Sequence, residues 1–317
     1  MGDTQPIIPA VDIFLQQIFN GLTLGSIYAL VALGYTMVYG IMGLINFAHG
    51  EVVMIGALTA LATAKALLAA GLPPALVLPL ALLTAVLVCM ALGATIERVA
   101  YRPLRNAPRL APLITAIGVS IVLQQVAMLV WGRNYHSVPQ LLPTGAHEVF
   151  GAHITDVQLI IMATAALTML GLMQLVNRTR LGRAMRATSE SPAIAALMGV
   201  DANRIIMLTF VIGSGLGALA GVMVSANYGI AHYHMGFLLG LKAFTAAVLG
   251  GIGNLGGAMV GGLLLGIIEA LGAGYIGDLT GGVLGSNYQD VFAFFVLIVV
   301  LIFRPSGLMG EKVAERA

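Results

Sequence analysis

Apolar residues occupy this chain in long runs that short polar stretches interrupt. The first run lies between Phe14 and Gly71 and contains no Lys or Arg before Lys65. A helix needs about 20 residues to cross a bilayer, so a run of this length predicts two crossings. Its compact polar interruption, residues 46–51 (Asn-Phe-Ala-His-Gly-Glu), marks either the boundary between two crossings or a helix that is broken inside the membrane.

The remaining apolar runs predict an all-α polytopic membrane protein with about nine transmembrane helices in one bundle. The junction 250–257 (Gly-Gly-Ile-Gly-Asn-Leu-Gly-Gly) is either a loop or a re-entrant break, so eight or ten crossings also fit. The expected spans are about 18–40, 52–71, 74–96, 110–131, 157–176, 205–227, 237–252, 257–275 and 289–304.

Composition supports this interpretation, because 59% of the residues are hydrophobic, only 9% are charged, and the mean hydropathy is +0.98. Soluble domains carry about 25% charged residues. Long apolar runs also exclude an outer-membrane barrel, whose strands alternate polar and apolar positions. So little sequence lies outside the spans that we expect one membrane domain over 1–317 and no soluble catalytic domain. The first residues lack the basic region of a signal peptide, so the first apolar segment is expected to stay as a span.

Basic residues gather in three segments, which predicts the orientation. Cytoplasmic loops are enriched in Lys and Arg, and nine crossings would place all three segments inside. The C-terminus is then cytoplasmic, the N-terminus lies outside, and the loop at about 132–156 is the longest outer connection. The three segments contain Arg98, Arg102, Arg105 and Arg109; Arg178, Arg180, Arg183, Arg186 and Arg204; and Arg304, Lys312 and Arg316.

Glycines stand four residues apart in the later spans, where they share one face of a helix. Small residues at this spacing allow close approach of helix backbones in lipid. They pack either within this chain or against a second membrane subunit. The spaced glycines are Gly213, Gly217 and Gly221, then Gly257 and Gly261, and also Gly262 and Gly266.

Nucleotide and metal chemistry find little support in the sequence. Residues 251–256 match G-x-G-x-x-G, but no strand–helix alternation surrounds them, so a glycine break between spans is the better interpretation. No P-loop motif occurs, and the single cysteine, Cys89, excludes a cysteine metal site. His49 and Glu51 alone are too few for a metal site.

The polar segment at about 178–204 predicts a short helix between basic arms. Ser191 can cap it, Pro192 suits its first turn, and Gly199 can end it. Ala193, Ala196 and Leu197 then share a face. Docking of a soluble partner and an ordinary solvated loop fit this segment equally well from the residues alone.

Ionisable residues inside the spans are His49, Glu51, Lys242 and Glu269. A charge at the centre of a span costs about 2.5–3.5 kcal/mol. An ion pair between Lys242 and Glu269 would satisfy both. Glu51 lies either at the membrane interface or inside the bundle.

Several motifs together resemble one known family. They are residues 21–30 (GLTLGSIYAL), 34–40 (GYTMVYG), 45–51 (INFAHGE), 96–103 (IERVAYRP), the loop 182–199 and 242–253 (KAFTAAVLGGIG). The chain resembles the LivH-type permease of the high-affinity branched-chain amino-acid ABC importers. The resemblance runs essentially from end to end and is weakest at 132–156 and in the tail.

The resemblance implies a bacterial inner-membrane permease domain with no enzymatic activity of its own. It implies a second homologous permease, two cytoplasmic ATP-binding subunits that hold ATP and Mg²⁺, and a periplasmic protein that delivers leucine, isoleucine or valine. Transport would follow alternating access, with membrane lipid around the bundle, no cofactor in this chain and no nucleic acid. The short helix becomes a coupling helix, whose candidate residues are Arg183, Glu190, Ala195, Ala196 and Gly199.

The substrate path is expected to have an apolar wall with a few hydrogen-bonding groups. Alternatives are a related importer for urea, amides or other amino acids, and an ion-coupled transporter, for which only Glu51 and Glu269 offer acidic relay groups. Whether 46–51 lines the path or a subunit interface stays open. The candidate path residues are Tyr35, Thr36, Tyr39, Asn46, His49 and Glu51.

Overall fold

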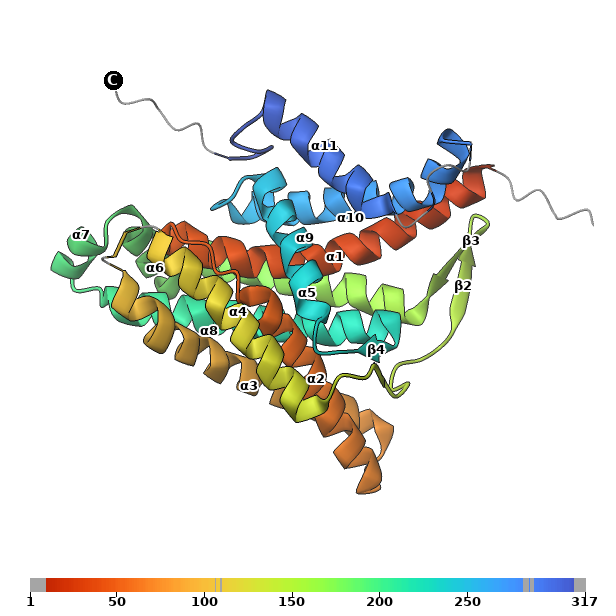
Figure 1. Cartoon of the computed structure of the whole chain (residues 1–317), viewed down its shortest axis with the longest axis horizontal. Coiled ribbons are helices and arrows are strands. Elements are labelled where there is room, and N and C mark those ends of the chain that lie inside the picture. Colours follow the sequence, from red (N-terminus) through yellow and green to blue (C-terminus); the bar gives the residue numbers. More distant parts are fainter. Residues whose placement is uncertain (1–9, 106, 109, 282–284, 286–287, 311–317) are drawn as a thin grey trace, which may run out of the picture.

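The computed structural model describes residues 10–105, 107–108, 110–281, 285 and 288–310. Arg109, Lys312 and Arg316 and the first nine residues therefore lie outside the described part. Eleven α-helices form the described chain (Figure 1). Their bounds are α1 Ala10–Met42, α2 His49–Ala69, α3 Pro74–Ile96, α4 Leu110–Trp131, α5 Asp156–Arg178, α6 Arg180–Glu190, α7 Pro192–Leu197, α8 Ala202–Tyr228, α9 Met235–Gly250, α10 Leu255–Leu279 and α11 Gln289–Phe303.

Each of the nine apolar segments in the sequence corresponds to one helix. Within the described residues, seven helices are long and apolar enough to cross a membrane, while α9 (16 residues) and α11 (15 residues) are shorter. A helix of 15 residues is about 22 Å long, less than the hydrocarbon thickness of about 30 Å. Nine complete crossings therefore stay a prediction.

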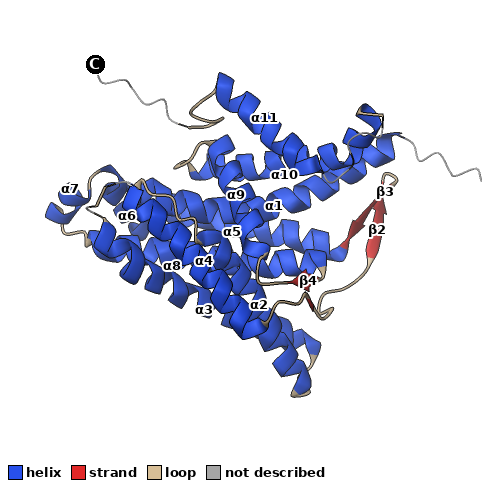
Figure 2. Ribbon diagram, viewed as in Figure 1, coloured by secondary structure: helices blue, strands red, loops and turns tan. Residues whose placement is uncertain are grey.

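Small strands occur outside the helices, so the all-α description holds only for the bundle (Figure 2). β2 (Ala146–Val149) and β3 (Ala152–Thr155) form a hairpin, and β1 (His136–Ser137) pairs with β4 (Ile230–Ala231). Phe150 and Gly151 join the hairpin with φ of 50° and 83°. A positive φ at both central residues gives the turn a twist that matches the right-handed twist of the two strands. The hydropathy of such short segments does not predict these strands.

The molecule has two distinct ends. At one end, the Gln16 side chain of α1 exchanges hydrogen bonds with the backbone of His153, at 2.9 and 2.8 Å. At the other end lie α6 and α7, near the end of α1 (Figure 1). There Arg105 contacts Asn203, and Asn254 donates to the carbonyl of Met309. The described basic segments thus gather at the α6–α7 end.

Helices α1–α4 and α8–α11 form two halves with equivalent packing. The contacts of α1 with α10 and α9 correspond to those of α8 with α3 and α2. Likewise, the contacts of α2 with α3 and α4 correspond to those of α9 with α10 and α11. α1 leads toward the α6–α7 end, whereas α8 starts there and leads away. The halves are therefore inverted relative to each other, and α5–α7 connect them.

Candidate functional site

The polar interruption at 46–51 lies inside the bundle. α2 begins with His49, whose ring packs so closely on Gly34 that a Cβ there would lie 2.2 Å from Nε2. Gly34 precedes the end of α1 at Met42 by eight residues, which is about 12 Å along a helix axis. The connection between α1 and α2 therefore folds back into the bundle. The polar interruption thus separates two helices that are each long and apolar enough to cross a membrane, and its His49 lies within the bundle.

Glu51 is held in the interior without an ion pair among the described residues. Its Oε1 accepts hydrogen bonds from Ser120 Oγ at 3.1 Å and from Gln124 Nε2 at 2.7 Å, both on α4. Its Oε2 has no hydrogen-bond partner in the same part of the chain. The position in the first turn of α2 favours the negative charge, because the helix dipole is positive there.

Asn46 and His49 are also enclosed by this chain. Asn46 Oδ1 accepts a hydrogen bond from the Tyr101 hydroxyl at 3.1 Å, and Tyr101 packs on Phe210 with ring centroids 5.1 Å apart. Tyr101 lies in a π-helical turn, Glu97–Tyr101, that extends α3. Asn46, His49 and Glu51 are thus buried between helices of one chain.

The other candidate path residues separate into two places. Tyr35 is buried with its ring edge-on to His49, at a centroid distance of 5.0 Å. Thr36 lines a small cavity of about 90 Å³ at the α6–α7 end, with Met185 and Ser189 of α6. Tyr39 is partly buried near Gly253. Thr36 thus lines this small cavity, whereas Tyr35 and Tyr39 are not among its lining residues.

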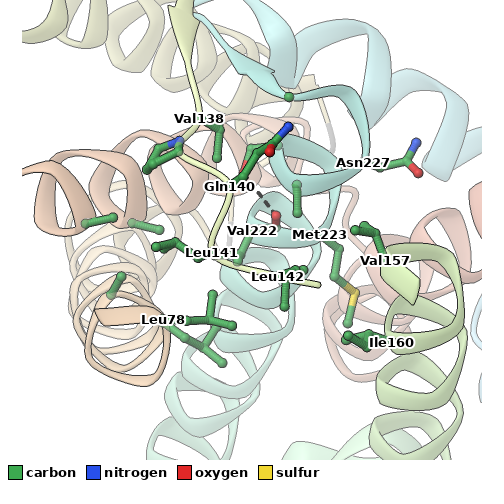
Figure 3. A pocket seen from close by; sticks show the side chains of 18 of the residues that line it. Leu78, Val138, Gln140, Leu141, Leu142, Val157, Ile160, Val222, Met223 and Asn227 are labelled. Carbon is green, nitrogen blue, oxygen red and sulfur yellow. Dashed lines mark hydrogen bonds between the residues drawn. The ribbon is translucent and has the colours of Figure 1, made fainter. Parts of the chain in front are cut away.

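A larger cavity of about 510 Å³ lies at the end opposite α6 and α7 (Figure 3). α2, α3, α5 and α8 form its walls, and the segment 138–144 crosses it. The wall is mostly aliphatic, and polar groups come from Gln140, Asn227 and Tyr228 among others. None of the six candidate path residues lines this cavity. Its walls come from segments that are far apart in the sequence and meet only when the helices pack. The feature of the sequence that could have indicated this cavity is the polar end of α8, where Asn227 and Tyr228 lie.

Lys242 stands at the centre of a buried ionic cluster (below, the Lys242 cluster). Its Nζ lies 2.6 Å from Glu269 Oε1 of α10 and 2.7 Å from Asp290 Oδ1 of α11. The Tyr28 hydroxyl of α1 donates to Glu269 Oε2 at 2.9 Å. The Lys242–Glu269 pair expected from the sequence is present. Asp290 was missed, because the sequence places it at the edge of a span and cannot show its depth.

The polar segment at about 178–204 contains two short helices, α6 and α7, where the sequence suggested one. Thr179 caps α6 and Ser191 caps α7, each by accepting from a backbone N–H. Gly199 follows with φ of 82°, a conformation that suits glycine.

The outward apolar face of α7 is formed by Ile194, Leu197 and Met198, which are 63%, 87% and 81% exposed. Ala195 is buried, so its side chain packs inward. Arg183, Glu190, Ala196 and Gly199 are exposed. Apart from Ala195, the coupling candidates thus stand at the surface of this end.

The spaced glycines face other helices of this chain. A Cβ on Gly221 would lie 2.1 Å from the Val53 carbonyl of α2, and one on Gly261 would lie 2.1 Å from the Ala246 carbonyl of α9. A Cβ on Gly257 would meet the Gly250 carbonyl at 2.4 Å. Gly213 lies opposite Gly34, and Gly217 lies against His49. All five occupy contacts within the bundle.

Metal-ligating residues do not gather in the described part of the chain, where no group of three His, Cys, Asp or Glu side chains could hold a metal ion. Cys89 is buried in α3 and donates to the Val52 carbonyl at 3.4 Å.

Comparisons with known proteins agree over nearly the whole chain. A family model described as "Branched-chain amino acid transport system / permease component" matches residues 17–301. The chain is 49% identical to the high-affinity branched-chain amino acid transport system permease protein BraD of Pseudomonas aeruginosa, over 98% of this chain and 100% of BraD. It is 47% identical to the corresponding permease protein LivH of Escherichia coli, over 96% of this chain and 97% of LivH. Among solved structures, PsaBC from Streptococcus pneumoniae in complex with Fab matches 93% of this chain with 15% identity and a TM-score of 0.45, too distant to support an argument.

Proposed function

This chain belongs to the family of branched-chain amino acid transport system permease components, and on that premise we propose that it is the membrane-spanning subunit of an ATP-driven importer of leucine, isoleucine and valine. The observation that carries the proposal is the 49% identity to BraD over 98% of the chain. The chain is a permease and not an enzyme. Under the proposal, ATP and Mg²⁺ are held by two partner subunits.

The ends of the molecule support an orientation in a bacterial inner membrane. Arg98, Arg105 and Arg304 lie in segments at the α6–α7 end, and the first turns of α1 lie at the other end beside β3. Positive charge favours the cytoplasmic side. Under the proposal, the α6–α7 end and the C-terminus are cytoplasmic, and the N-terminus and the loop at 132–156 are periplasmic.

The α6–α7 segment is the proposed coupling element. Its exposed Ile194, Leu197 and Met198 offer an apolar ridge to a cytoplasmic ATP-binding subunit. α6, which precedes the ridge, is tied to the bundle, because Arg186 donates to the carbonyl of Val176 at the end of α5. Movement of the ATP-binding subunits would therefore reach α5 and α8 through short, capped connections.

A periplasmic binding protein would deliver the amino acid at the opposite end, and a second homologous permease would complete the path. The cavity of about 510 Å³ at that end has the aliphatic wall and sparse polar groups that suit a branched side chain. The small cavity beside Thr36 lies toward the cytoplasmic end of the same bundle.

Reconstitution tests the function directly. The chain is purified with its neighbouring gene products, placed in liposomes with ATP inside, and supplied with leucine-loaded binding protein outside. We expect uptake that depends on both ATP and the binding protein. Uptake by this chain alone in an ion gradient would refute the ABC importer, and uptake of urea but not leucine would change the substrate.

A further inference from the structure

The Lys242 cluster lies at the depth of the membrane interior. α11 has 15 residues, about 22 Å, and the segment that follows it is hydrogen-bonded to Leu249 and Gly250 at the cytoplasmic end. Asp290, in the first turn of α11, is therefore about 20 Å from that end. Tyr28, which donates to Glu269, lies 12 residues after Gln16, about 18 Å from the outer loop. The cluster thus lies more than one helical turn inside both ends of the bundle.

Charge in this cluster is not balanced within the described residues. With both carboxylates ionised, Lys242 faces two negative charges, Glu269 and Asp290, which leaves one in excess. Glu269 is enclosed, with a side-chain exposure of 2%, whereas the Asp290 side chain is 30% exposed. The excess negative charge therefore points to the outside of the described chain.

Lipid cannot cover such a group at this depth, because a carboxylate facing hydrocarbon costs several kcal/mol. The exposed residues of its own helix are apolar: Val291, Ile298 and Ile302 are 62%, 56% and 71% exposed. A carboxylate framed by apolar side chains suits a small molecule that has a cationic group and an aliphatic chain.

The outer cavity differs from the Lys242 cluster in its charge. Tyr228, at the end of α8, lines that cavity. No charged residue of the described chain lines the cavity itself, so its wall cannot balance the ammonium group of an amino acid.

We propose that the face of α9 and α11 around Asp290 lines the water-filled path at the boundary with the second permease, and that Asp290 receives the ammonium group of the passing amino acid. This inference rests on the proposed function. It gives the two features separate roles: the outer cavity admits the aliphatic side chain, and the Lys242 cluster accepts the positive charge.

Cysteine accessibility in the assembled transporter tests the proposal. On a Cys89→Ala background, the Asp290→Cys variant is treated with a membrane-impermeant cationic methanethiosulfonate. We expect rapid labelling that is slowed severalfold while leucine-loaded binding protein and ATP drive transport. The matched control is Phe295→Cys on the same helix, 61% exposed and turned away from Asp290, which we expect to face lipid and stay unlabelled.

The second measurement tests whether leucine uptake depends on the negative charge of Asp290. Asp290→Asn is expected to lower leucine uptake at least about tenfold, the loss of one charge-assisted hydrogen bond, while Asp290→Glu keeps part of it. No labelling of the Asp290→Cys variant together with normal uptake by Asp290→Asn would overturn the proposal. No labelling of that variant with loss of the second permease from the purified complex would assign Asp290 to a subunit contact instead. If the unmodified complex takes up no leucine, the proposed function fails, whatever the labelling shows.

Discussion

Replacing Gly221 by Ala tests how closely α2 and α8 approach. An added Cβ would lie 2.1 Å from the Val53 carbonyl oxygen and 2.9 Å from the Ala57 nitrogen, whereas ordinary contacts begin at 3.4 Å. Both obstacles are backbone atoms of α2, so no side chain can turn aside. The two helices must move apart by about 1 Å, and overpacking of this kind costs about 1–3 kcal/mol.

Gly215 on the same helix supplies the control. An added Cβ there would meet only Met90 and Val86 side-chain atoms, at 3.5–3.8 Å. Gly215→Ala should therefore show only the gain in helix propensity, up to about 1 kcal/mol. Gly217→Ala, whose nearest contact is 3.3 Å from a His49 ring atom, should fall between the two.

The free energy of unfolding is measured by titrating the detergent-solubilised protein with SDS and following helix content by circular dichroism. Gly221→Ala should unfold at lower SDS and Gly215→Ala at equal or higher SDS, a difference of about 2 kcal/mol or more. Equal effects of Gly221→Ala and Gly215→Ala would refute the contact between α2 and α8 as the reason for glycine at 221.

Three further variants test other contacts. Lys242→Met leaves the Glu269 and Asp290 carboxylates without their cation and should cost about 3 kcal/mol in the SDS titration, against less than about 1 kcal/mol for Asp156→Asn in the exposed pair with His147; similar losses would contradict a buried ion pair. Tyr101→Phe removes the hydrogen bond to Asn46 and should cost about 1 kcal/mol, and an unchanged unfolding midpoint would count against it. Leu197→Glu, at an 87% exposed position, should keep stability but abolish binding-protein-stimulated ATPase and uptake, and normal coupling would exclude α7 as the docking ridge.

Hydropathy and local capping rules predicted much of the fold. Long apolar runs placed the seven long and two shorter apolar helices of the described chain within a few residues, except that α1 starts earlier than expected. Ser191 and Pro192 predicted the start of α7. These features depend on neighbouring residues in one segment. The ion pair Lys242–Glu269 was also accessible to sequence reasoning, because two opposite charges in separate spans have few other partners.

The sequence did not predict how deep a residue lies in the bundle or which distant residues it contacts. The interruption at 46–51 has the same residues whether it lies at the membrane surface or, as observed, beside Gly34 in the bundle. The cavity walls come from four helices and a loop, and Asp290 joins Lys242 across two helices.

The sequence by itself determined that this chain is a bundle of membrane helices, where most of those helices begin and end, and to which family it belongs. Only the tertiary structure decided that α2 starts inside the bundle, that Asp290 pairs with Lys242, and that the glycines face backbone atoms of other helices. The physical reason is that helix formation follows from the local run of residues, whereas depth and contact follow from how whole helices tilt and pack.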